Sequence, residues 1–379
     1  MTATRPAGPP GAGLRPPAVC QVAAYAWPLG LDADGAMVFP SLAFAHHCSD
    51  KLWSWEGPVW HPADARFAKV AAGGSGLAGL GLDGRVYYRP NQDWAGPRPP
   101  GVTEGGTVAG LLAFPPDAEL VDVAVGWDFV VAADADGRVH MMLIRRRRLG
   151  SRHLAETAEY RQAPTPSGAP IVAVSAGDVH WAVLDADGRV HTAGGNQYGQ
   201  LGDGTKQPRP HPAPALCFPD DDPAVEVHAA AAHTSIVTAS GRVFQTGAVT
   251  AHWKRNPPVM GGPEAGQPGF PRGTRITTMS SGETHMLALD QDQTVWAWGD
   301  NSAHQLGCDA QIRWSPRPRP VVGLPRDRQV KQLAAGKRYS IALADDGSAC
   351  AWGWNEEGHL GVNSPHDYQR HPAKIHWAQ

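Results

Sequence analysis

The sequence predicts an all-β fold, a seven-bladed β-propeller. Three observations support this prediction: a repeat of about fifty residues, a hairpin signal in every repeat, and almost no helical periodicity. The 379-residue chain contains seven turn dipeptides whose second residues lie 49 to 54 residues apart. This period favours one closed array over the two or three domains that the length alone suggests. The dipeptides are Asp34-Gly35, Asp83-Gly84, Asp136-Gly137, Asp187-Gly188, Ser240-Gly241, Asp292-Gln293 and Asp346-Gly347.

Each repeat is predicted to centre on a β-hairpin. In unit four, the apolar run Trp181 to Leu184 precedes the turn Asp187-Gly188, and Arg189-Val190-His191 follows it. An Asp-Gly loop between such runs favours a type I′ turn, in which both central residues have positive φ. Small residues such as Ala176-Gly177 recur before the second strand, as strands crowded around a central axis require.

The ring is predicted to close through the C-terminal strand. Open hairpins would expose sheet edges, and a radial ring of four-stranded blades protects them. The segment His371 to Trp377 looks like the strand that precedes other units, so we expect it to complete the blade begun near Val22. Residues 20–379 then form the propeller, at about 49–54 residues per repeat, and the Pro- and Gly-rich residues 1–19 a disordered tail. The best helix candidate is Ser151 to Gln162.

Composition limits the partners and the compartment. Lys and Arg number 33 against 36 Asp and Glu, a net charge of -3, so no overall attraction to nucleic acid or anionic lipid is expected. No apolar run reaches the length of a membrane span, and the five scattered cysteines form no Cys-x-x-Cys motif. We therefore expect a monomeric protein in the reducing cytoplasm. Two arginines without an acid in the first nineteen residues leave organelle targeting as an alternative.

The sequence does not predict an enzyme, a cofactor or a metal site. Gly79 to Gly84 form a Gly-x-Gly-x-x-Gly pattern, but the predicted strand Arg85 to Tyr88 follows where a dinucleotide fingerprint requires a helix. Walker A, Gly-x-Ser-x-Gly and His-Glu-x-x-His motifs are absent. His46, Cys48 and Asp50 alternate in a connector, where a zinc site is the alternative to a polar stretch.

A second signature follows the hairpin in three units. It reads Gly194-Gly195-Asn196 through Gln200-Leu201-Gly202, Trp298-Gly299-Asp300-Asn301 through Gln305-Leu306-Gly307, and Trp352-Gly353-Trp354-Asn355 through Leu360-Gly361. With the Ala-Gly-x-x-His and Asp-Gly-x-Val segments, this pattern resembles the RCC1 (regulator of chromosome condensation) family. The resemblance covers about residues 20–379 and implies a seven-bladed propeller, with Trp298 and Trp352 as blade packing.

Units one, two, three and five depart from this signature, so their connectors are candidate determinants of partner specificity. Exposed tryptophan buries a large area at low entropic cost, and a run of arginines forms a basic patch whose alternative is a solvated loop. The candidate binding residues in the connectors are Trp53, Trp55, Trp60, Arg145, Arg146, Arg147 and Arg148.

The loop before the second strand supplies a second candidate surface. In exchange factors that resemble this family, this loop and the residue before the histidine face a small GTPase. The residues here that match that face are Asp128, Asp178, Glu283, Thr284, His285 and Arg338. The candidate partner-binding residues of the face loops as a whole are Trp127, Asp128, Asp178, His180, His233, Glu283, His285, Arg338 and Tyr339. The alternative is that the histidines hydrogen-bond the loops and hold the blades together.

We therefore expect a non-enzymatic scaffold that binds another protein through these face loops and connectors. Two further functions remain open: guanine-nucleotide exchange or regulation of a small GTPase, and inhibition of an enzyme by capping its active site. Unit three has no acidic wedge loop of the kind such exchange factors insert, since its connector is rich in arginine.

Overall fold

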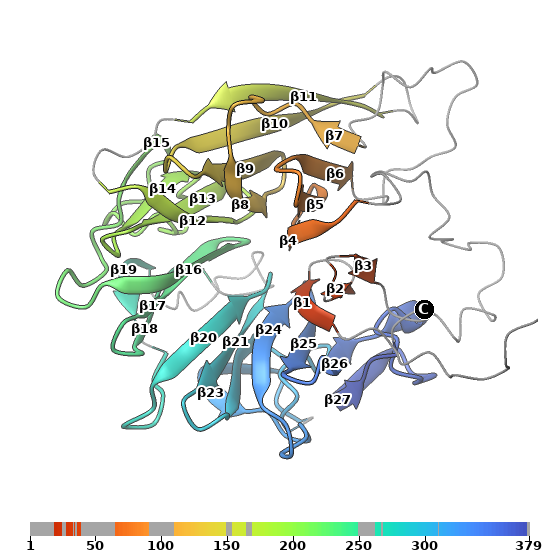
Figure 1. Ribbon diagram of the computed structural model, residues 1–379. Helices are drawn as coiled ribbons and strands as arrows, with labels where there is room; N and C mark the ends of the chain where they lie inside the picture. Colours follow the sequence, from red (N-terminus) through yellow and green to blue (C-terminus); the bar gives the residue numbers. More distant parts are fainter. Residues whose placement is uncertain are drawn as a thin grey trace, which may run out of the picture.

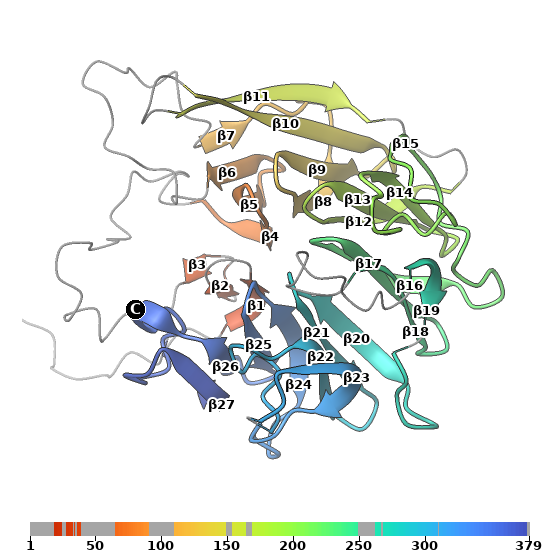
Figure 2. The same cartoon turned by 180° about the vertical axis from the view of Figure 1, so that it is seen from behind.

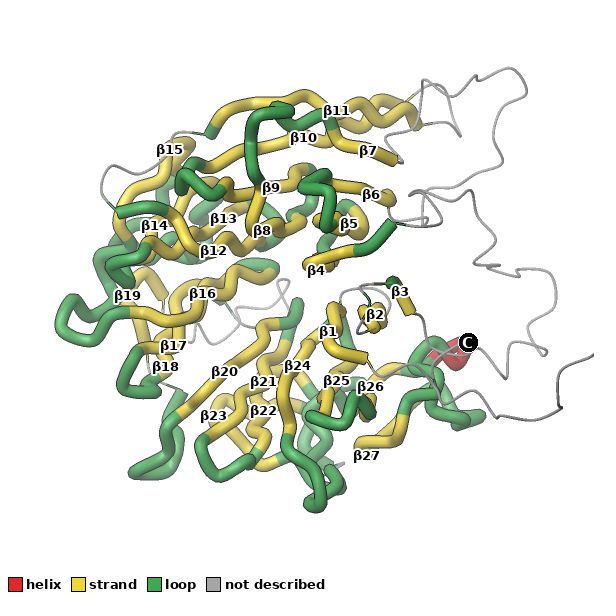
Figure 3. The backbone as a smooth tube through the Cα atoms, viewed as in Figure 1, coloured by secondary structure: helices red, strands yellow, loops and turns green. Residues whose placement is uncertain are grey.

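The computed structural model describes residues 19–24, 28–32, 34, 36–38, 65–90, 110–148, 154–163, 169–248, 262–266, 268–309 and 311–376. Antiparallel sheets are arranged around a central axis (Figure 1). Strands and turns make up almost all of the described chain, with the single-turn 3-10 helix η3 (Glu356–Gly358) near its C-terminal end (Figure 3). The all-β propeller prediction is confirmed. Among the described residues, no helix has the length and apolarity needed to cross a bilayer.

In the part of the chain that the structure describes, six sheets have four strands and the sheet of unit one has three. Blade one contains β1 (Val19–Ala24), β2 (Pro28–Asp32) and β3 (Met37–Val38). Blade two contains β4 (Phe67–Ala72), β5 (Gly76–Gly81), β6 (Val86–Pro90) and β7 (Gly110–Leu112), and blade three β8 (Leu120–Val125), β9 (Phe129–Asp134), β10 (Val139–Arg148) and β11 (Leu154–Gln162). Blade four contains β12 (Ile171–Ala176), β13 (His180–Asp185), β14 (Val190–Gly194) and β15 (Arg209–Pro214), and blade five β16 (Ala224–Ala230), β17 (His233–Thr238), β18 (Val243–Gly247) and β19 (Gly262–Gly266). Blade six contains β20 (Ile276–Ser281), β21 (His285–Asp290), β22 (Val295–Asp300) and β23 (Trp314–Pro320), and blade seven β24 (Val330–Ala335), β25 (Tyr339–Ala344), β26 (Ala349–Trp354) and β27 (Tyr368–Lys374).

The first strand of each blade is the innermost, and the chain runs outward through the sheet. The strand order within blades two to seven follows the sequence, so each of these blades is a simple meander. Inner strands of neighbouring blades, such as β12 and β16, lie against each other near the axis. This crowding explains the small residues that end the inner strands.

The predicted closure by the C-terminal strand is wrong. Strand β27 pairs with β26, where Cys350 lies opposite Lys374, and completes its own blade. The segment His371 to Trp377 resembles strands before other units because those strands also end the preceding blade. The ring closes by packing: β1 lies against β24 and β25 on one side and against β4 on the other.

The predicted hairpins are present, but the turns that the structure describes in full, those of units two to seven, are not type I′. In unit four, the Gly188 N–H donates to the Asp185 carbonyl and the Asp185 N–H donates to the Arg189 carbonyl, at 3.0 Å each. Only the glycine has positive φ, 79° at Gly188. The loop is one residue longer than Asp-Gly, a type I turn followed by a bulge. In unit six, Gln293 takes this place with φ 62°.

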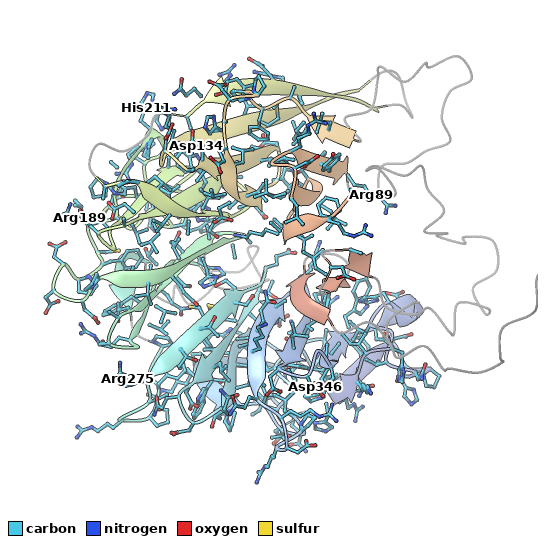
Figure 4. All side chains as sticks on the ribbon, in the orientation of Figure 1. Arg89, Asp134, Arg189, His211, Arg275 and Asp346 are labelled. Carbon is cyan, nitrogen blue, oxygen red and sulfur yellow. The ribbon has the colours of Figure 1, made fainter. Side chains whose placement is uncertain are left out.

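An aspartate at the start of several turns stabilises them through its side chain. The Asp134 carboxylate, labelled in Figure 4, accepts the Arg138 N–H at 2.8 Å and lies 2.8 Å from His140 Nε2. Asp185 makes the equivalent contacts with Arg189 and His191. These turns contain two aspartates, one immediately before the glycine and one three residues before it. The buried carboxylate explains the presence of the second.

The connectors of blades four, six and seven contain a repeated clip, defined as residues 196–201, 301–306 and 355–360. Each clip begins with an asparagine whose side-chain oxygen accepts the N–H of a leucine five residues later, at 2.9 to 3.1 Å. The leucines are fully buried, as are Trp298 and Trp352, which confirms these tryptophans as blade packing. The leucines are Leu201, Leu306 and Leu360.

The helix expected at Ser151 to Gln162 is wrong. Residues Leu154–Gln162 form the strand β11, which pairs with β10 over nine consecutive positions. Spacing of Leu154, Ala158 and Arg161 at helical intervals did not decide the conformation, because pairing with a neighbouring strand satisfies the backbone and overrides a weak local pattern.

Candidate functional site

One face of the propeller carries the loops between the first and second strands of each blade. Because successive strands run in opposite directions, the connectors between third and fourth strands reach this same face. We call the described loops on this face the axial loops. They comprise residues 73–75, 126–128, 177–179, 231–232, 282–284 and 336–338.

Backbone hydrogen bonds link the axial loops of neighbouring blades. The Ser75 N–H donates to Gly126 O at 2.8 Å and the Trp127 N–H to Asp178 O at 3.0 Å. Similar bonds join Asp178 to Ala231 and Glu283 to Gly336, at 3.3 Å. These bonds fix the loops relative to one another, so the face is a rigid platform.

The two variable positions between the glycine and the histidine of these loops have different environments. The carbonyl of the second position accepts an N–H from the third strand, as Asp128 does from Ile144 at 2.7 Å and Thr284 from Asp300 at 2.9 Å. The residues at the first position are Gly74, Trp127, Asp178, Ala231, Glu283 and Lys337. Four of them, Gly74, Asp178, Ala231 and Glu283, line a pocket between the loops.

A small pocket opens at the axis between these loops. Its volume of about 70 Å³ has room for a few water molecules and is far below the roughly 300 Å³ of a typical ligand site. The arrangement therefore suits single side chains of a docking protein better than an organic cofactor. The lining residues, nearly all small, are Ala72, Gly73, Gly74, Val125, Ala176, Gly177, Asp178, Ala229, Ala230, Ala231, Ser281, Gly282, Glu283 and Ala335.

Two carboxylates and two cationic side chains, Lys337 and Arg338, set the charge around the axial pocket. Burial, and next the charge of Glu283, raises the pKa of Asp178 to about 6, against a smaller opposing effect of Lys337. Burial also raises the pKa of Glu283, although Lys337 Nζ lies 3.6 Å from its Oε2 and favours the charged form. Arg338 also favours the charged form of Glu283, but of these four side chains only the two carboxylates line the pocket, so the pocket itself is suited to a cation.

Apolar surface adjoins these charges. Trp127 is 46% exposed and Val179 49% exposed, on neighbouring axial loops. The Trp127 indole packs over Gly74, where an added Cβ would lie 2.6 Å from Cε3. Asp128, next to Trp127, is exposed. Half-exposed apolar residues beside half-buried charges form a surface typical of a protein interface centre.

The loop histidines do not belong to this surface. His180, His233, His285 and Tyr339 are fully buried, so their assignment as partner-binding residues is wrong. A side chain at Gly177 would collide with the His180 ring and with the Ala230 carbonyl. The Gly-x-x-His pattern therefore records packing: the glycine makes room for the imidazole.

Hydroxyl groups of the next blade also explain why histidine recurs at this loop position. His180 Nε2 lies 3.0 Å from Thr234 Oγ1, which itself donates to the Gln200 carbonyl at 2.7 Å. Since the hydroxyl hydrogen is committed, Nε2 carries a proton and donates. His285 Nε2 likewise lies 2.8 Å from Ser340 Oγ, which donates to the Gln305 carbonyl at 2.7 Å. Burial lowers the pKa of both His180 and His285 to about 3, so these imidazoles are neutral.

The connector residues divide into described and undescribed ones. Trp53, Trp55 and Trp60, like residues 1–18 and the triad His46, Cys48 and Asp50, lie outside the described residues. Arg145 to Arg148 lie on β10 and pair with β11, so the solvated-loop alternative is wrong. Arg145 Nε donates to Glu159 Oε2 at 2.8 Å. Within the part of the chain that the structure describes, no group of three potential metal ligands comes together.

The structure thus gathers Trp127, Asp128, Asp178, Glu283 and Arg338 on one face. Sequence reasoning missed Val179 and Lys337 because it concentrated on the loop histidines and the positions that match them in other units. The first position after the loop glycine was a usable signal, since its residues vary strongly in size and charge where neighbouring positions repeat.

Known proteins with similar sequences share the repeats described above. Residues 187–237 and 292–343 match a family model described as regulator of chromosome condensation (RCC1) repeat, and residues 171–200 and 276–305 match a second model with the same description. The chain is 28% identical over 222 residues to human E3 ubiquitin-protein ligase HERC2, covering 55% of this chain and 4% of HERC2. It is 29% identical over 202 residues to the ultraviolet-B receptor UVR8 of Arabidopsis thaliana, covering 52% of this chain and 44% of the receptor. The chain therefore spans less than half the length of these relatives.

The fold is similar to that of yeast RCC1 (Prp20) in its crystal structure with Kap60. The TM-score is 0.65 at 19% identity, and the match covers 82% of this chain and 75% of the yeast chain. This likeness shows the fold. The similarity to HERC2 is confined to a segment of about 220 residues in a much longer ligase.

Proposed function

Since the chain is built from RCC1 repeats folded as a propeller, we propose that it is a non-enzymatic scaffold whose protein partner docks on the axial loops. The observation that carries this proposal is the pairing of half-exposed Trp127 and Val179 with the half-buried carboxylates of Asp178 and Glu283. The relative that was crystallised with Kap60 provides a precedent for protein binding by this fold.

The chemistry of the axial pocket favours a basic side chain of the partner. A lysine or arginine placed there meets two carboxylates, and the half-exposed Trp127 ring on the neighbouring loop is available to an apolar or cationic side chain of the same partner. The loops are already fixed by inter-blade hydrogen bonds, so docking orders little of the scaffold. The partner segment is therefore expected to be positively charged, with apolar side chains that contact Trp127 and Val179.

Quantitative affinity purification of matched variants tests this proposal. The axial variant combines Trp127→Ala with Asp178→Asn, and the control variant combines Leu111→Ala with Tyr368→Ala, which removes exposed apolar groups from outer strands. We expect the axial variant to lose at least about tenfold of the partner signal, as for residues at an interface centre, and the control to retain it. Equal recovery by both variants contradicts the proposal.

The pH dependence of partner affinity gives a sharper test. Because the pKa of Asp178 is raised to about 6, its carboxylate gains charge as the pH rises through that value. Binding of a basic partner should therefore strengthen between pH 5.5 and 7.5. Asp178→Asn should flatten this dependence while leaving the fold intact. A basic partner whose affinity does not depend on Asp178 contradicts the assignment of the axial pocket.

Regulation of a small GTPase is the second candidate function. Four residues matched to the GTPase-facing loops remain accessible, namely Asp128, Asp178, Glu283 and Arg338, whereas Thr284 and His285 are buried. A nucleotide-release assay with fluorescent GDP on any GTPase captured as partner separates the two functions. Accelerated release that is lost in the axial variant supports exchange, and unchanged release with intact binding supports the scaffold.

A further inference from the structure

The outer strand of blade three differs from the outer strands of the other blades. Strand β11 has nine residues and contains no proline. By contrast, β15 (RPHPAP) and β23 (WSPRPRP) contain three prolines each, β19 (GPEAG) and β27 (YQRHPAK) contain one each, and β7 has three residues. Proline removes a backbone donor and so protects a sheet edge from pairing. Blade three is the one described four-stranded blade with a long edge that lacks this protection.

The pairing of β11 with β10 is also the most regular of the outer pairs. Nine consecutive residue pairs, from His140 opposite Gln162 to Arg148 opposite Leu154, show no register shift. The outer pairs of blades four to seven all contain a shift. Both views of the ribbon place β11 on the outer boundary of the molecule, with no described strand beyond it (Figures 1 and 2).

The hydrogen-bond alternation identifies the groups that β11 presents to solvent. The Ala163 N–H donates to Val139 O, so odd-numbered residues of this segment bond toward β10. On the other side of β10, the Ile144 N–H donates to Asp128 O, which confirms the alternation. The N–H and C=O groups of Ala158, Tyr160 and Gln162 therefore point away from β10, at the spacing that an added strand requires.

The two faces beside this edge differ in chemistry. On one face, Tyr160 packs against Phe114 with ring centroids 6.3 Å apart, and Ala158 lies exposed next to it. On the opposite face, Arg145 and Arg161 both contact Glu159, which leaves one positive charge in excess. A strand that pairs with β11 would therefore place apolar side chains on the Tyr160 face and acidic side chains on the arginine face.

We propose that β11 is a second interaction site, which binds an extended segment of a partner protein as an added antiparallel strand with alternating apolar and acidic residues. Main-chain hydrogen bonds supply the affinity and the alternation supplies the specificity. The site lies on the periphery of the ring, separate from the axial loops, so one scaffold would hold two segments at once.

A synthetic nine-residue peptide of alternating valine and glutamate, capped at both ends, serves as the probe in calorimetric titrations. Ala158→Pro removes an outward N–H and copies the edges of the other blades, whereas Ala158→Val keeps that N–H and is the matched control. We expect Ala158→Pro to weaken binding at least about tenfold and Ala158→Val to change it less than about twofold. In hydrogen exchange, the peptide should protect the amides of Ala158, Tyr160 and Gln162.

Peptide variants keep the proposal testable even where Ala158→Pro does not fold. Valine side chains on the Tyr160 face belong to residues whose N–H groups bond β11, so N-methylation of the valines should abolish binding to the unmodified protein. N-methylation of the glutamates blocks the far edge and should leave binding intact. Equal binding of the two methylated peptides, or unchanged binding to Ala158→Pro, overturns the proposal. The proposal is also overturned if the protein binds no peptide but forms a dimer that Ala158→Pro dissociates. In that case the occupant of the β11 edge is a second copy of the chain.

Discussion

The interface between blades six and seven and the interface between blades two and three are filled by different side chains at equivalent positions. In the first, Trp352 packs with Leu306 of the clip and with the small Ala297. In the second, Met142 takes the place of Trp352, the large Tyr88 takes the place of Ala297, and Ile144 adds to the core. Large and small residues are exchanged across the interface, and all these side chains are buried.

This difference shows that the clip is one of two ways to fill the space between blades. Blade two has no Gln-Leu-Gly segment in its connector, and its core is completed by Tyr88, whose hydroxyl donates to Ser75 O at 2.7 Å, and by the longer strand β10 of blade three. Loss of the repeat signature therefore marks a change of packing partner, since volume and not residue identity is what the interface requires.

The largest expected difference between the two parts of the ring is in their response to acid. His180, His233, His285 and His359 are buried in blades four to seven, where burial lowers the pKa of each to about 3 or about 4. Blades two and three have Gly76 and Phe129 at the histidine position.

Below about pH 6.5 the unfolded chain binds protons that the buried imidazoles do not, so stability falls as the pH falls, by up to about 1.4 kcal/mol per pH unit and histidine. Blades four to seven should lose several kcal/mol between pH 7 and pH 5. Hydrogen exchange at both pH values measures this, and His285→Asn should reduce the slope. Uniform loss of protection around the ring contradicts the assignment.

Truncation of the interface leucines is the next largest effect. Leu306→Ala should cost about 3 kcal/mol, because the residue is fully buried and enclosed by blades six and seven. Ile144→Ala should cost about 2 kcal/mol at the other interface, and Leu111→Ala, an exposed control, less than about 0.5 kcal/mol. Urea unfolding of the three variants provides the comparison. Equal losses of unfolding free energy for Leu306→Ala and Leu111→Ala would contradict a packing role for the clip.

Substitutions of the turn glycines in blades two and four distinguish the cost of backbone strain from the cost of a steric collision. Gly84 and Gly188 have φ of 75° and 79°, but a side chain at Gly84 meets nothing, whereas one at Gly188 collides with Pro223. Gly84→Val should therefore cost about 1 kcal/mol and Gly188→Val about 2 kcal/mol or more. Melting temperatures measured on both variants test this order. The reverse order would mean that the collision is relieved by movement of Pro223.

Exchange of one packing pair for the other gives the smallest effect and the closest test of the comparison. Ala297→Tyr alone overfills the interface of blades six and seven, and Trp352→Met alone leaves a cavity there. Combined, they copy the pair Tyr88 and Met142. The double variant should therefore be more stable than the sum of the single losses by about 1 kcal/mol, measured as a double-mutant cycle. Strict additivity would show that the two interfaces are not equivalent.

The repeat period and the apolar runs were sufficient to predict the propeller and its hairpins. Local patterns were less reliable where a contact with another part of the chain decides the conformation. The turn at Gly188 has an extra residue because the Asp185 side chain accepts the Arg189 N–H at 2.8 Å, and nothing in the Asp-Gly dipeptide shows that bond. The strand β11 likewise depends on its pairing with β10.

The candidate site was predicted only in part, for a related reason. A polar residue that recurs in a loop was interpreted as functional, yet His180 is buried because Gly177 makes room for it and Thr234 of the next blade accepts a hydrogen bond from its Nε2–H. The residues at the axial pocket differ from unit to unit. Asp178 and Glu283 were among the candidates, but that they line one pocket became visible only when the loops of several blades were placed around one axis.

Each of the six four-stranded sheets is formed by strands that follow one another directly in the chain. Duplication or loss of a segment one repeat long therefore adds or removes a whole blade and divides no sheet. Covalent cuts placed in the links between blades, such as the link between β15 and β16, would likewise leave every hydrogen-bond ladder complete. In its strand pairing, as distinct from the side chains that fill each interface, the ring behaves as a string of separate modules. Tandem duplication can lengthen it, and circular permutation can reorder it, without new strand pairings.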